Sequence, residues 1–451
     1  MDIVPVTEAH PLPDGEVRLL GAVRGVTGAM TRIEIAGVRL LVDCGVAQGR
    51  ERVDWRFPDA ARDVDAVLLT HGHLDHVGSL PALLAGGWEG PILSTRATFA
   101  IARIVLRDGL TLEGATEEEA DALIARLDAL HHPLKYDARE MPFGGVAVAF
   151  REAGHILGSA SIELVSGKSR VIVSGDLGRP DTPILRTYNQ TWDAARPVDL
   201  VVLETTYGDR EHASDHAHIR QELGRILYRA IERGGYVLVP AFAIGRTQVL
   251  LYHLNALVES GYLAGVPVVL DSPMGLAVTE TYSHFRSLYD KAALERLAYG
   301  DDPLDFEGLY AVMRPRDSER LHDLEAPAIV IASSGMCTGG RIVGHLVELL
   351  PHEETCVLFV GYQAEGTPGR AILEAARARD ERGGVPTVTL DGVEVEVRAS
   401  VEMLSGLSAH ADRGELRAWL DAIPDVRRVA LHHGEVDAQE AFARWVQAPR
   451  S

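Results

Sequence analysis

The stretch THGHLDHVG, residues 70–78, constrains the fold and the chemistry of this chain more than any other. It places three histidines and an aspartate within six residues, directly after the apolar run DAVLLT, which is typical of a buried strand. Side chains alternate along an extended segment, so His71 and His73 point to the same side and can bind one metal ion. Asp75 and His76 lie where the chain turns towards a helix, and they can face a second ion. A chance cluster on a surface loop is the alternative, but 18 histidines in the whole chain make this spacing hard to obtain by chance.

The length and composition indicate a globular protein with more than one core. At 451 residues the chain exceeds what one hydrophobic core usually organises, so we expect two domains or one domain with a large insertion. No segment is apolar for long enough to span a bilayer, and the start lacks a signal-peptide pattern, so we expect a cytoplasmic protein with no membrane partner. The three cysteines (Cys44, Cys337, Cys356) are far apart, which argues against disulfides or a cysteine-based zinc site. Histidine and carboxylate ligands suit Zn²⁺, Mn²⁺ or Fe.

The net charge of −21 limits how a polyanion can bind. Proteins that bind nucleic acid through their overall field are normally basic, because neutralising phosphates supplies most of the affinity. Any polyanionic ligand must therefore meet local positive charge here, and bound divalent cations can supply part of it.

The pattern of apolar residues changes twice along the chain. Residues 16–45 alternate apolar and polar residues between glycines, which predicts antiparallel strands, and residues 97–130 show helical spacing. After about Gly208, amphipathic helical stretches alternate with short apolar runs, a pattern typical of βαβ units and a parallel sheet. From about Val393 the pattern is again strand and loop. We therefore predict a first domain formed by residues 1–207 and 392–451, with residues 208–391 inserted into it.

Two metal ions need more ligands than one loop can supply. His155 in GHILGSAS and Asp176 in VIVSGDLG each follow an apolar strand, in an order that lets them converge on the first loop. Each is also a common kind of turn residue, which is the alternative interpretation. A carboxylate such as Asp176 is what a two-metal site needs to hold its ions about 3.5 to 4 Å apart.

Seven short motifs resemble those of a known family. Asp43 in DCG, the HGHLDH stretch, GHILGSAS and SGDLG are similar, in order, to the motifs of the metallo-β-lactamase superfamily, an α/β fold built as an αββα sandwich with metals at one edge. Glu204 in LETTYGD, His410 in SAHAD and His433 in HHGE resemble three further motifs of the β-CASP nucleases. In that group an α/β domain containing a mainly parallel sheet is inserted between the first and second of these three, where the pattern changes here.

The resemblance assigns a role to each motif residue. It implies two Zn²⁺ ions per chain, with Mn²⁺ as the alternative. One ion would be held by His71, His73 and His155, and the other by Asp75, His76 and His433. Asp176 would bridge the two ions. His432 is the adjacent candidate, but the family pattern HGE selects His433. Asp43 resembles the carboxylate that orients a ligand histidine, although a strand-end turn residue is the alternative.

The implied reaction is hydrolysis of RNA phosphodiester bonds, in RNA processing or decay. Water held between two metals has its pKa lowered from about 15.7 towards about 7. His410, oriented by Glu204, is suited to protonate the leaving ribose oxygen. The alternative for His410 is a structural histidine packed between domains. Asp75 is a further catalytic candidate. RNA is favoured over DNA because DNA-directed members tend to carry Val at the position of His433. Endonuclease action and a 5′ exonuclease mode both remain open, and homodimers are common in the group.

Several residues are candidates to bind substrate phosphates. Arg246, Arg341 and Arg370 each follow a glycine at the start of a predicted helix, where a guanidinium and backbone N–H groups can hold a phosphate. Surface charge or helix capping is an equally good explanation of each. The full set of phosphate candidates is Arg246, Ser333, Ser334, Arg341, Arg370 and Ser408.

Two other functions compete with this one. A hydrolase of a small ester or thioester would use the same metals, but it has no need of Glu204, His410 or the insertion. A non-catalytic RNA-binding scaffold would bind RNA, but such members usually lose metal ligands, and this sequence keeps them all.

Overall fold

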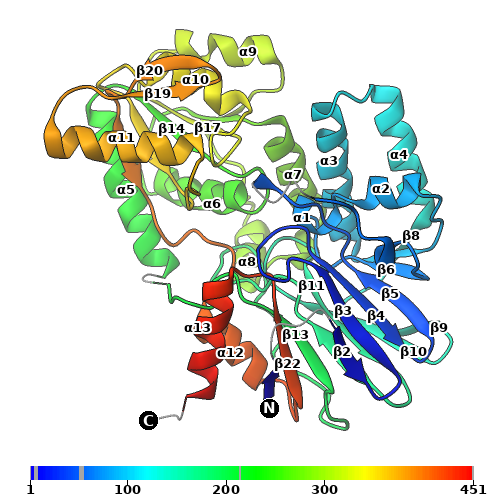
Figure 1. Ribbon diagram of the computed structural model, residues 1–451. Helices are drawn as coiled ribbons and strands as arrows, with labels where there is room; N and C mark the ends of the chain where they lie inside the picture. The colour runs from blue at the N-terminus through cyan, green and yellow to red at the C-terminus, as the bar shows by residue number, and fades with distance from the viewer. Residues whose placement is uncertain (1, 5–8, 50–54, 213–214, 449–451) are drawn as a thin grey trace. The chain divides into compact units, whose positions relative to one another are not determined.

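The computed structural model describes residues 2–4, 9–49, 55–212 and 215–448. The chain divides into two compact units, one formed by residues 1–211 and 409–451 and the other by residues 212–408. The second unit is thus inserted into the first (Figure 1). Its end lies beyond the predicted boundary at 391/392, because strand β21 (Ser400–Met403) pairs with β18 (Cys356–Phe359) inside the inserted unit. Within the described ranges, no helix has the length and apolarity to cross a membrane.

The first unit is built on two β-sheets that pack face to face. One has the strand order β2-β3-β4-β5-β6-β7-β8, and the other β1-β22-β13-β12-β11-β10-β9. Strands β3, β4 and β5 pair antiparallel, as the alternating sequence predicts, whereas β5, β6, β7 and β8 pair parallel. The strands are β1 Asp2–Val4, β2 Ala9–Leu12, β3 Gly15–Gly21, β4 Met30–Ile35, β5 Val38–Val42, β6 Ala66–Leu68, β7 Ile92–Ser94, β8 His131–Pro133, β9 Arg139–Phe143, β10 Val146–Glu152, β11 Ala160–Val165, β12 Arg170–Val173, β13 Leu200–Glu204 and β22 Arg428–His432.

Alternation along the second sheet determines which face each side chain covers. Val171 and Val173 of β12 join the core between the two sheets, together with Ile33 and Leu40 of the first sheet. Ile172, between them, points to the outer face and packs with the C-terminal helices. Each of these buried aliphatic side chains contributes about 1.5–3 kcal/mol through removal of apolar surface from water.

Helices cover the outer faces of both sheets and complete the αββα layers predicted from the sequence (Figure 1). Trp419 of α12 and Phe442 of α13 are fully buried on the outer face of the second sheet. On the first sheet's side, α3 begins after Thr95, whose hydroxyl accepts a hydrogen bond from the Thr98 N–H, which satisfies a helix-terminal donor. The helices of this unit are α1 Leu74–Val77, α2 Leu80–Ala85, α3 Arg96–Leu112, α4 Glu117–Leu130, α12 Arg413–Asp421 and α13 Val436–Gln447, with a 3₁₀ turn η2 at Asp59–Ala61.

The inserted unit contains a parallel sheet with the strand order β16-β15-β17-β14-β18-β21. This confirms the parallel sheet predicted from alternating helical and apolar stretches. Its strands are β14 Tyr236–Pro240, β15 Val268–Asp271, β16 Leu309–Ala311, β17 Ala328–Ala332, β18 and β21, with a hairpin of β19 Thr387–Leu390 and β20 Val393–Glu396. Its helices are α5 His216–Glu232, α6 Arg246–Glu259, α7 Pro273–His284, α8 Lys291–Ala298, α9 Pro315–Glu319, α10 Arg341–Leu349 and α11 Pro368–Arg382, with 3₁₀ turns η3 Arg286–Leu288 and η4 Arg320–Asp323.

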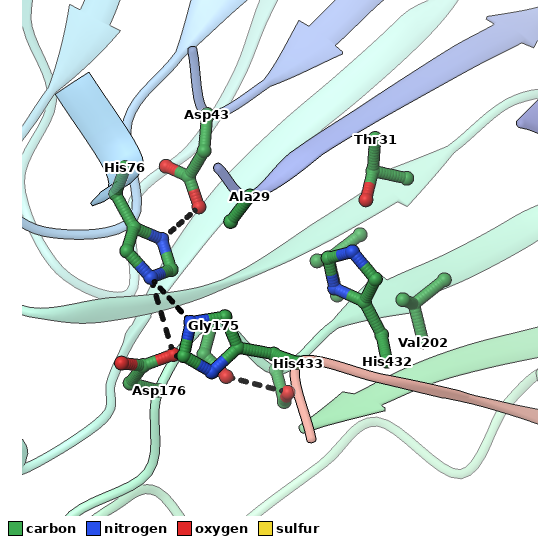
Figure 2. Close-up of a pocket in the computed structure, with 11 residues that line it drawn as sticks. Ala29, Thr31, Asp43, His76, Gly175, Asp176, Val202, His432 and His433 are labelled. Atoms are coloured by element: carbon green, nitrogen blue, oxygen red, sulfur yellow. Dashed lines mark hydrogen bonds and ion pairs between the residues drawn. The ribbon is translucent and has the colours of Figure 1, made fainter. Parts of the chain in front are cut away.

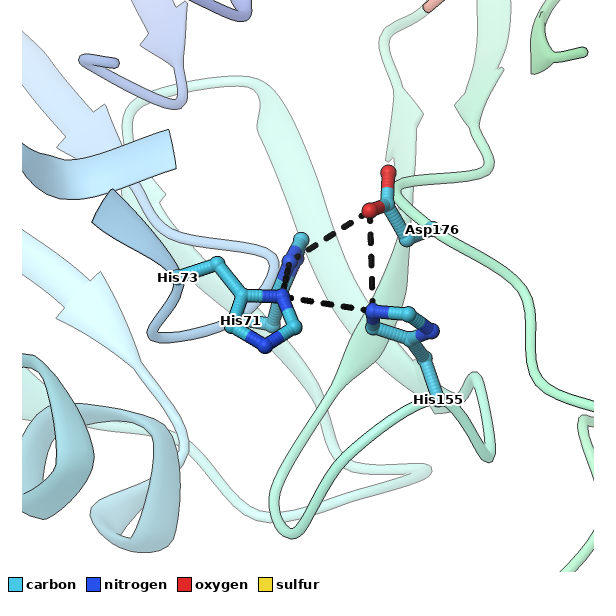
Figure 3. Close-up of side chains that lie close together, drawn as sticks. All are labelled: His71, His73, His155 and Asp176. Atoms are coloured by element: carbon cyan, nitrogen blue, oxygen red, sulfur yellow. Dashed lines mark hydrogen bonds and ion pairs between the residues drawn. The ribbon is translucent and has the colours of Figure 1, made fainter. Parts of the chain in front are cut away.

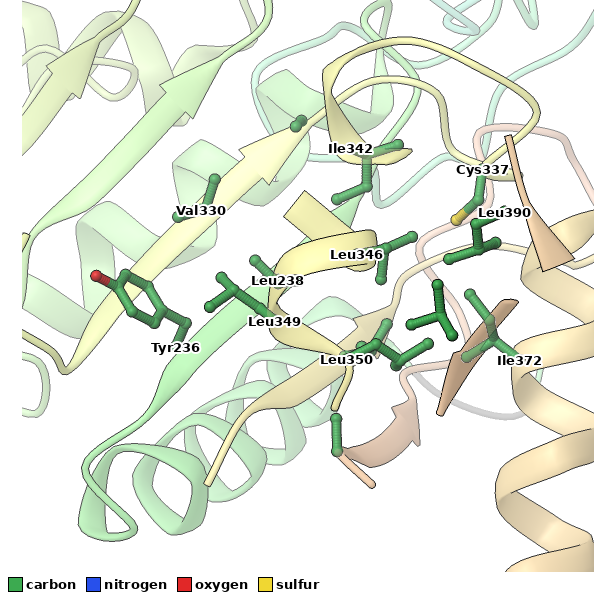
Figure 4. Close-up of a cluster of buried hydrophobic side chains, with 14 of the residues drawn as sticks. Tyr236, Leu238, Val330, Cys337, Ile342, Leu346, Leu349, Leu350, Ile372 and Leu390 are labelled. Atoms are coloured by element: carbon green, nitrogen blue, oxygen red, sulfur yellow. The ribbon is translucent and has the colours of Figure 1, made fainter. Parts of the chain in front are cut away.

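One hydrophobic cluster joins the sheet of this unit to its helices (Figure 4). Leu238 and Val330 come from the central strands β14 and β17, Ile342 and Leu346 from α10, and Ile372 from α11. The hairpin contributes Leu390 to the same cluster. The predicted boundary at 391/392 therefore falls in the turn of a hairpin that belongs to the core of the inserted unit.

Candidate metal centre

Four side chains from three loops of the first unit converge on one point (Figure 3). His71 Nε2 lies 3.0 Å from His73 Nδ1, and His155 Nε2 lies 3.3 Å from the same atom. Asp176 Oδ2 is 3.5 Å from His71 Nε2 and 3.6 Å from His155 Nε2. Ligands at about 2.0–2.1 Å from a tetrahedral Zn²⁺ are separated from one another by roughly 3.3 Å. The spacing of these four atoms thus fits one such ion.

A second group lies on the other side of Asp176 (Figure 2). His76 Nε2 is 3.2 Å from His433 Nε2, and Asp75 Oδ2 is 3.6 Å from the same His433 nitrogen. Asp176 Oδ1 is 3.4 Å from His76 Nε2, so the two oxygens of this carboxylate face the two groups separately. Asp176 Oδ1 is buried and accepts no hydrogen bond from the described residues. A buried oxygen without a donor costs free energy, which a cation at this position would offset.

The backbone of the first loop brings its ligand candidates together. β6 ends at Leu68, and His73 is the N-cap of the short helix α1, on which Asp75 and His76 lie. Gly72 separates the first two histidines, and a Cβ atom there would lie 2.7 Å from the Ile101 side chain of α3. The loop can therefore pack closely against α3 only because this residue is glycine.

The remaining ligand candidates come from the second sheet. His155 lies between β10 and β11, and its N–H donates to Ser159 Oγ at 2.9 Å. Asp176 follows β12, and His433 follows β22 with a left-handed backbone (φ 47°). Gly434 comes next, where a Cβ would lie 2.5 Å from Thr205 Oγ1. The turn after β22 can thus approach the end of β13 closely.

Burial and charge prepare most of these groups to bind a cation. Burial lowers the pKa of His71 and of His155 well below the usual value and that of His73 to about 4, so these rings are neutral, the form that binds metal. Burial acts to raise the pKa of Asp176, but the surrounding histidines hold it well below its usual value. Asp75 behaves in the same way, with a pKa of about 2.

His76 differs from the other histidines in its charge. Burial acts to lower its pKa, but the carboxylates of Asp176 and Asp43 raise it well above the usual value. A cation bound at His76 Nε2 must displace this proton, so metal binding here is coupled to proton release.

Asp43 lies behind the second group, where it contacts His76 and Thr70. Its Oδ2 is 2.8 Å from His76 Nδ1 and accepts the Thr70 hydroxyl at 2.8 Å, and its Oδ1 accepts the Thr70 N–H at 2.8 Å. The orienting role predicted for this carboxylate fits these contacts better than a strand-end turn does. Thr70 lies inside the quoted THGHLDH stretch, but its hydroxyl carries no metal-ligand signature that would have singled it out.

His410 and Glu204 form a pair beside the first group. His410 Nδ1 lies 3.3 Å from Glu204 Oε1 and 3.9 Å from Asp176 Oδ2. Glu204 Oε1 also accepts the Leu177 N–H at 2.9 Å, which fixes the carboxylate. Burial acts to lower the pKa of His410, but Glu204 raises it to about 9, so this ring is protonated at neutral pH.

His432 turns away from both groups. Its Nε2 is 2.7 Å from the Gly21 carbonyl oxygen, to which it donates. With Asp43 and His76 it lines a cavity behind the second group (Figure 2). Burial lowers the pKa of His432 to about 3, so the ring is neutral. The geometry thus favours His433 over His432 as the ligand, in line with the HGE pattern.

The arginine candidates for phosphate binding lie in the inserted unit and already have protein partners. Arg246 and Arg341 begin helices α6 and α10 after glycine N-caps, as predicted. Arg246 donates to the Val360 carbonyl, and Arg341 donates to Asp271 and to two carbonyls, which favours a structural role for Arg341. Arg370 lies in the first turn of α11 rather than at its start, and pairs with Glu374 at 2.6 Å.

The serine candidates are also in hydrogen-bonded or buried positions. Ser333 Oγ lies 2.8 Å from Ser272 Oγ, and Ser334 Oγ accepts the Thr338 N–H at 3.0 Å. Ser408 is largely buried at the end of the inserted unit. Phosphate contact by the arginine and serine candidates stays a prediction.

An αββα sandwich with histidines and aspartates gathered at the ends of its strands is the architecture of the metallo-β-lactamase superfamily. Three family models match the chain: the metallo-beta-lactamase superfamily over residues 24–230, the Beta-Casp domain over 247–372, and the Zn-dependent metallo-hydrolase RNA specificity domain over 394–449. The chain belongs to the β-CASP family of the metallo-β-lactamase superfamily.

Similar proteins come from bacteria and archaea. Ribonuclease TTHA0252 of Thermus thermophilus is 38% identical over 432 residues, covering 94% of each chain. Transcription termination factor FttA of Methanocaldococcus jannaschii is 29% identical over 96% of this chain and 68% of its own length, and FttA of Cenarchaeum symbiosum is 32% identical over 90% and 64%. A crystal structure of a protein of unknown function from Enterococcus faecalis V583 shares the fold, with a TM-score of 0.55 at 12% identity, covering 93% of this chain and 94% of that one.

Proposed function

We propose that this protein is a zinc-dependent ribonuclease that hydrolyses RNA phosphodiester bonds with two ions per chain. The observation that carries the proposal is the His410–Glu204 pair, 3.3 Å apart and beside the carboxylate of Asp176. A hydrolase of small esters needs the metals but has no need of this pair. The family model described as an RNA specificity domain spans both His410 and His433, and the Thermus relative is named a ribonuclease.

The ligand candidates would hold the ions in two groups that share Asp176. His71, His73 and His155 would bind one ion, and Asp75, His76 and His433 the other. When bound, such ions supply Lewis acidity that lowers the pKa of water towards about 7 and stabilises charge on phosphoryl oxygens.

His410 would move the proton that the leaving group needs. Its Nδ1 faces Glu204, so Nε2 is the nitrogen that would donate to the leaving ribose oxygen. A pKa of about 9 keeps the ring protonated at neutral pH, and Glu204, only 1% exposed, keeps it oriented. His410 itself is 22% exposed, so a substrate can approach the ring.

An RNA cleavage assay with two substrates tests this function. The zinc-loaded protein is given RNA labelled at its 3′ end, carrying either a 5′ hydroxyl or a 5′ monophosphate, and separately a chromogenic small ester. We expect RNA cleavage by the wild type, a large loss in His410→Ala, and no ester hydrolysis that depends on His410. Internal products mean endonuclease action, and a ladder from the 5′ end means exonuclease action.

Two outcomes would overturn the proposal. Ester hydrolysis that is unchanged in His410→Ala, without RNA cleavage, would indicate a small-molecule hydrolase. Binding of RNA without metal uptake or cleavage would indicate a non-catalytic scaffold.

A further inference from the structure

Most of the ligand-candidate histidines have the same orientation. His71, His76 and His155 present Nε2 to the centre, and their Nδ1 atoms point outwards to a hydrogen-bond partner. His433 Nε2 faces His76 and Asp75, and its Nδ1 lies 3.1 Å from Thr206 Oγ1 and 3.5 Å from Asp176 Oδ1. A ligand nitrogen must carry a lone pair, so the outer nitrogen of a neutral ring must carry the proton and donate it. For His76 the partner is the Asp43 carboxylate, and for His155 it is the Ala409 carbonyl, and both of these groups only accept.

His71 and His433 have partners of a different kind, because a threonine hydroxyl can either donate or accept. Thr70 Oγ1 lies 3.0 Å from His71 Nδ1, and Thr206 Oγ1 lies 3.1 Å from His433 Nδ1. A hydroxyl that donated to Nδ1 would force the ring proton onto Nε2 and remove the lone pair from the centre. The direction of these two hydrogen bonds therefore decides whether the rings can bind metal.

The single hydroxyl proton of Thr70 has a strong acceptor elsewhere. Thr70 Oγ1 donates to Asp43 Oδ2 at 2.8 Å, and both residues are buried. A hydrogen bond to a carboxylate is stronger than one to a neutral imidazole. The oxygen is thus left to accept from His71 Nδ1–H, and Asp43 acts on His71 through Thr70 while it contacts His76 directly.

The proton of Thr206 is directed in the same way. Thr206 Oγ1 donates to the carbonyl oxygen of His433 at 3.1 Å, and this carbonyl also accepts the Thr205 N–H at 3.1 Å. The hydroxyl thereby contacts both the backbone and the ring of His433. Its oxygen, 3.1 Å away, is nearer to His433 Nδ1 than Asp176 Oδ1 at 3.5 Å, and both oxygens can accept the ring proton. A proton on Nδ1 leaves the lone pair of Nε2 facing His76 and Asp75.

We propose that the hydroxyls of Thr70 and Thr206 are positioning groups that fix the tautomers of His71 and His433, one in each half of the metal centre. The inference rests on the proposed function, because it assumes that these histidines bind metal. It adds two neutral side chains to the site, each acting on one ion through the outer nitrogen of one ligand.

The backbone at His433 is also held by hydrogen bonds that do not involve Thr206. The His433 N–H donates to the Ala22 carbonyl at 2.9 Å, and the Gly434 N–H donates to the Gly25 carbonyl at 2.9 Å. On the other side, Thr205 Oγ1 donates to the His432 carbonyl at 3.1 Å. Replacing Thr206 should therefore change the tautomer and orientation of the ring rather than the course of the chain.

Thr70→Val and Thr206→Val, compared with Thr70→Ser and Thr206→Ser, test the proposal. Valine keeps the shape and removes the hydroxyl, whereas serine keeps the hydroxyl. Metal-free protein is titrated with Zn²⁺ in competition with a chromophoric chelator. We expect each valine variant to bind one of its two ions about 10- to 100-fold more weakly, and each serine variant to stay near wild type. Thr31→Val should match wild type in zinc affinity. Thr31 is a buried threonine that lines the cavity formed with Asp43 and His76, and in the described residues it has no hydrogen bond to a ligand candidate.

A His433→Ala background assigns each effect to one half of the centre. There, Thr206→Val should have no further effect on zinc affinity, whereas Thr70→Val should still weaken the remaining ion. In ¹⁵N-histidine spectra of the zinc-loaded protein, Nδ1 of His71 and of His433 should be the protonated nitrogen. Each valine variant should disturb this signal for its own histidine alone.

The outcomes separate this inference from the proposed function. A wild type that takes up no zinc and cleaves no RNA would overturn the proposed function and this inference with it. A wild type that does both, with valine variants of unchanged affinity, would overturn the inference alone. Serine variants as weak as the valine variants would also overturn it, because the hydroxyl would then not be the cause. Unfolding of the metal-free variants in urea shows whether a variant is folded. If a valine variant is not folded, the zinc affinity of the corresponding serine variant, compared with wild type, tests the inference.

Discussion

Asp43→Asn should weaken both halves of the metal centre at once, because this one carboxylate orients a ligand candidate in each. The substitution keeps the size of the side chain and replaces one oxygen by an amide. If Oδ1 keeps the Thr70 N–H, the new NH₂ group faces the Thr70 hydroxyl and His76 Nδ1, both of which donate to Oδ2. The reverse orientation sets the NH₂ group against the Thr70 N–H instead.

The size of the effect follows from these contacts. To pair with the amide, the Thr70 hydroxyl must turn its proton to His71 Nδ1, and His76 Nδ1 must accept. Both rings would then carry their proton on Nε2, the nitrogen that faces the centre. A hydrogen bond to a charged group contributes about 1.5–3 kcal/mol, which corresponds to roughly 10- to 100-fold in affinity. We therefore expect zinc binding to weaken by about this factor for each of the two ions.

The assay is a chelator-competition titration with zinc, together with urea unfolding of the metal-free protein. Asp199→Asn is a matched control, because Asp199 is also a buried carboxylate. It directly precedes β13 and accepts hydrogen bonds from the Arg170 N–H at 2.8 Å and from Arg427 at 2.6 Å. The Asp199→Asn variant should lose stability without losing zinc affinity. If Asp43→Asn binds both ions as tightly as wild type, or weakens no more than Asp199→Asn, Asp43 does not orient the two histidines.

The remaining predictions concern the proton donor and the charge of the site. His410→Ala should lower RNA cleavage about 10²- to 10⁴-fold at unchanged zinc content, measured by mass spectrometry; loss of zinc would instead make His410 a ligand. Burial acts to lower the pKa of His410 and Glu204 raises it to about 9, so cleavage should fall as pH rises through this value. Glu204→Gln should move this alkaline limb of the kcat/KM profile to lower pH, and an unmoved limb would contradict the pairing. Zinc uptake should release a proton and weaken as pH falls, because Asp176 and Asp43 outweigh burial and raise the pKa of His76. Calorimetry in buffers of different ionisation enthalpy measures the number of protons released. Zinc binding without proton release would contradict the raised pKa of His76.

The sequence predicted those parts of the site that depend on local spacing. His71 and His73 are two residues apart in an extended segment, so their side chains lie on the same side. The structure places His71 Nε2 3.0 Å from His73 Nδ1. His155 and Asp176 were identified because each follows an apolar strand, and the ends of neighbouring strands lie close together. The αββα fold class, which the family resemblance implies, is confirmed, and so is the parallel sheet that the alternation of helical and apolar stretches predicts.

The parts that sequence did not predict depend on long-range pairing. Arg341 begins a helix, which the sequence shows, but its ion pair with Asp271, on strand β15 70 residues earlier in the chain, could not be predicted from local sequence. β21 pairs with β18, so residues 400–403 belong to the inserted unit although their strand pattern resembles that of the first. Thr206 carries no charge and no metal-ligand signature, so only its position beside His433 Nδ1 distinguishes it from any other threonine.

RNA cleavage by this protein should depend on two ions held by this ligand set. The most direct measurement is cleavage of end-labelled RNA by metal-free protein as zinc is added stepwise, with bound zinc measured in the same samples. We expect no cleavage without metal, and cleavage that saturates at two ions per chain in the wild type. Cleavage by the metal-free protein, or full cleavage at one ion per chain, would contradict this expectation.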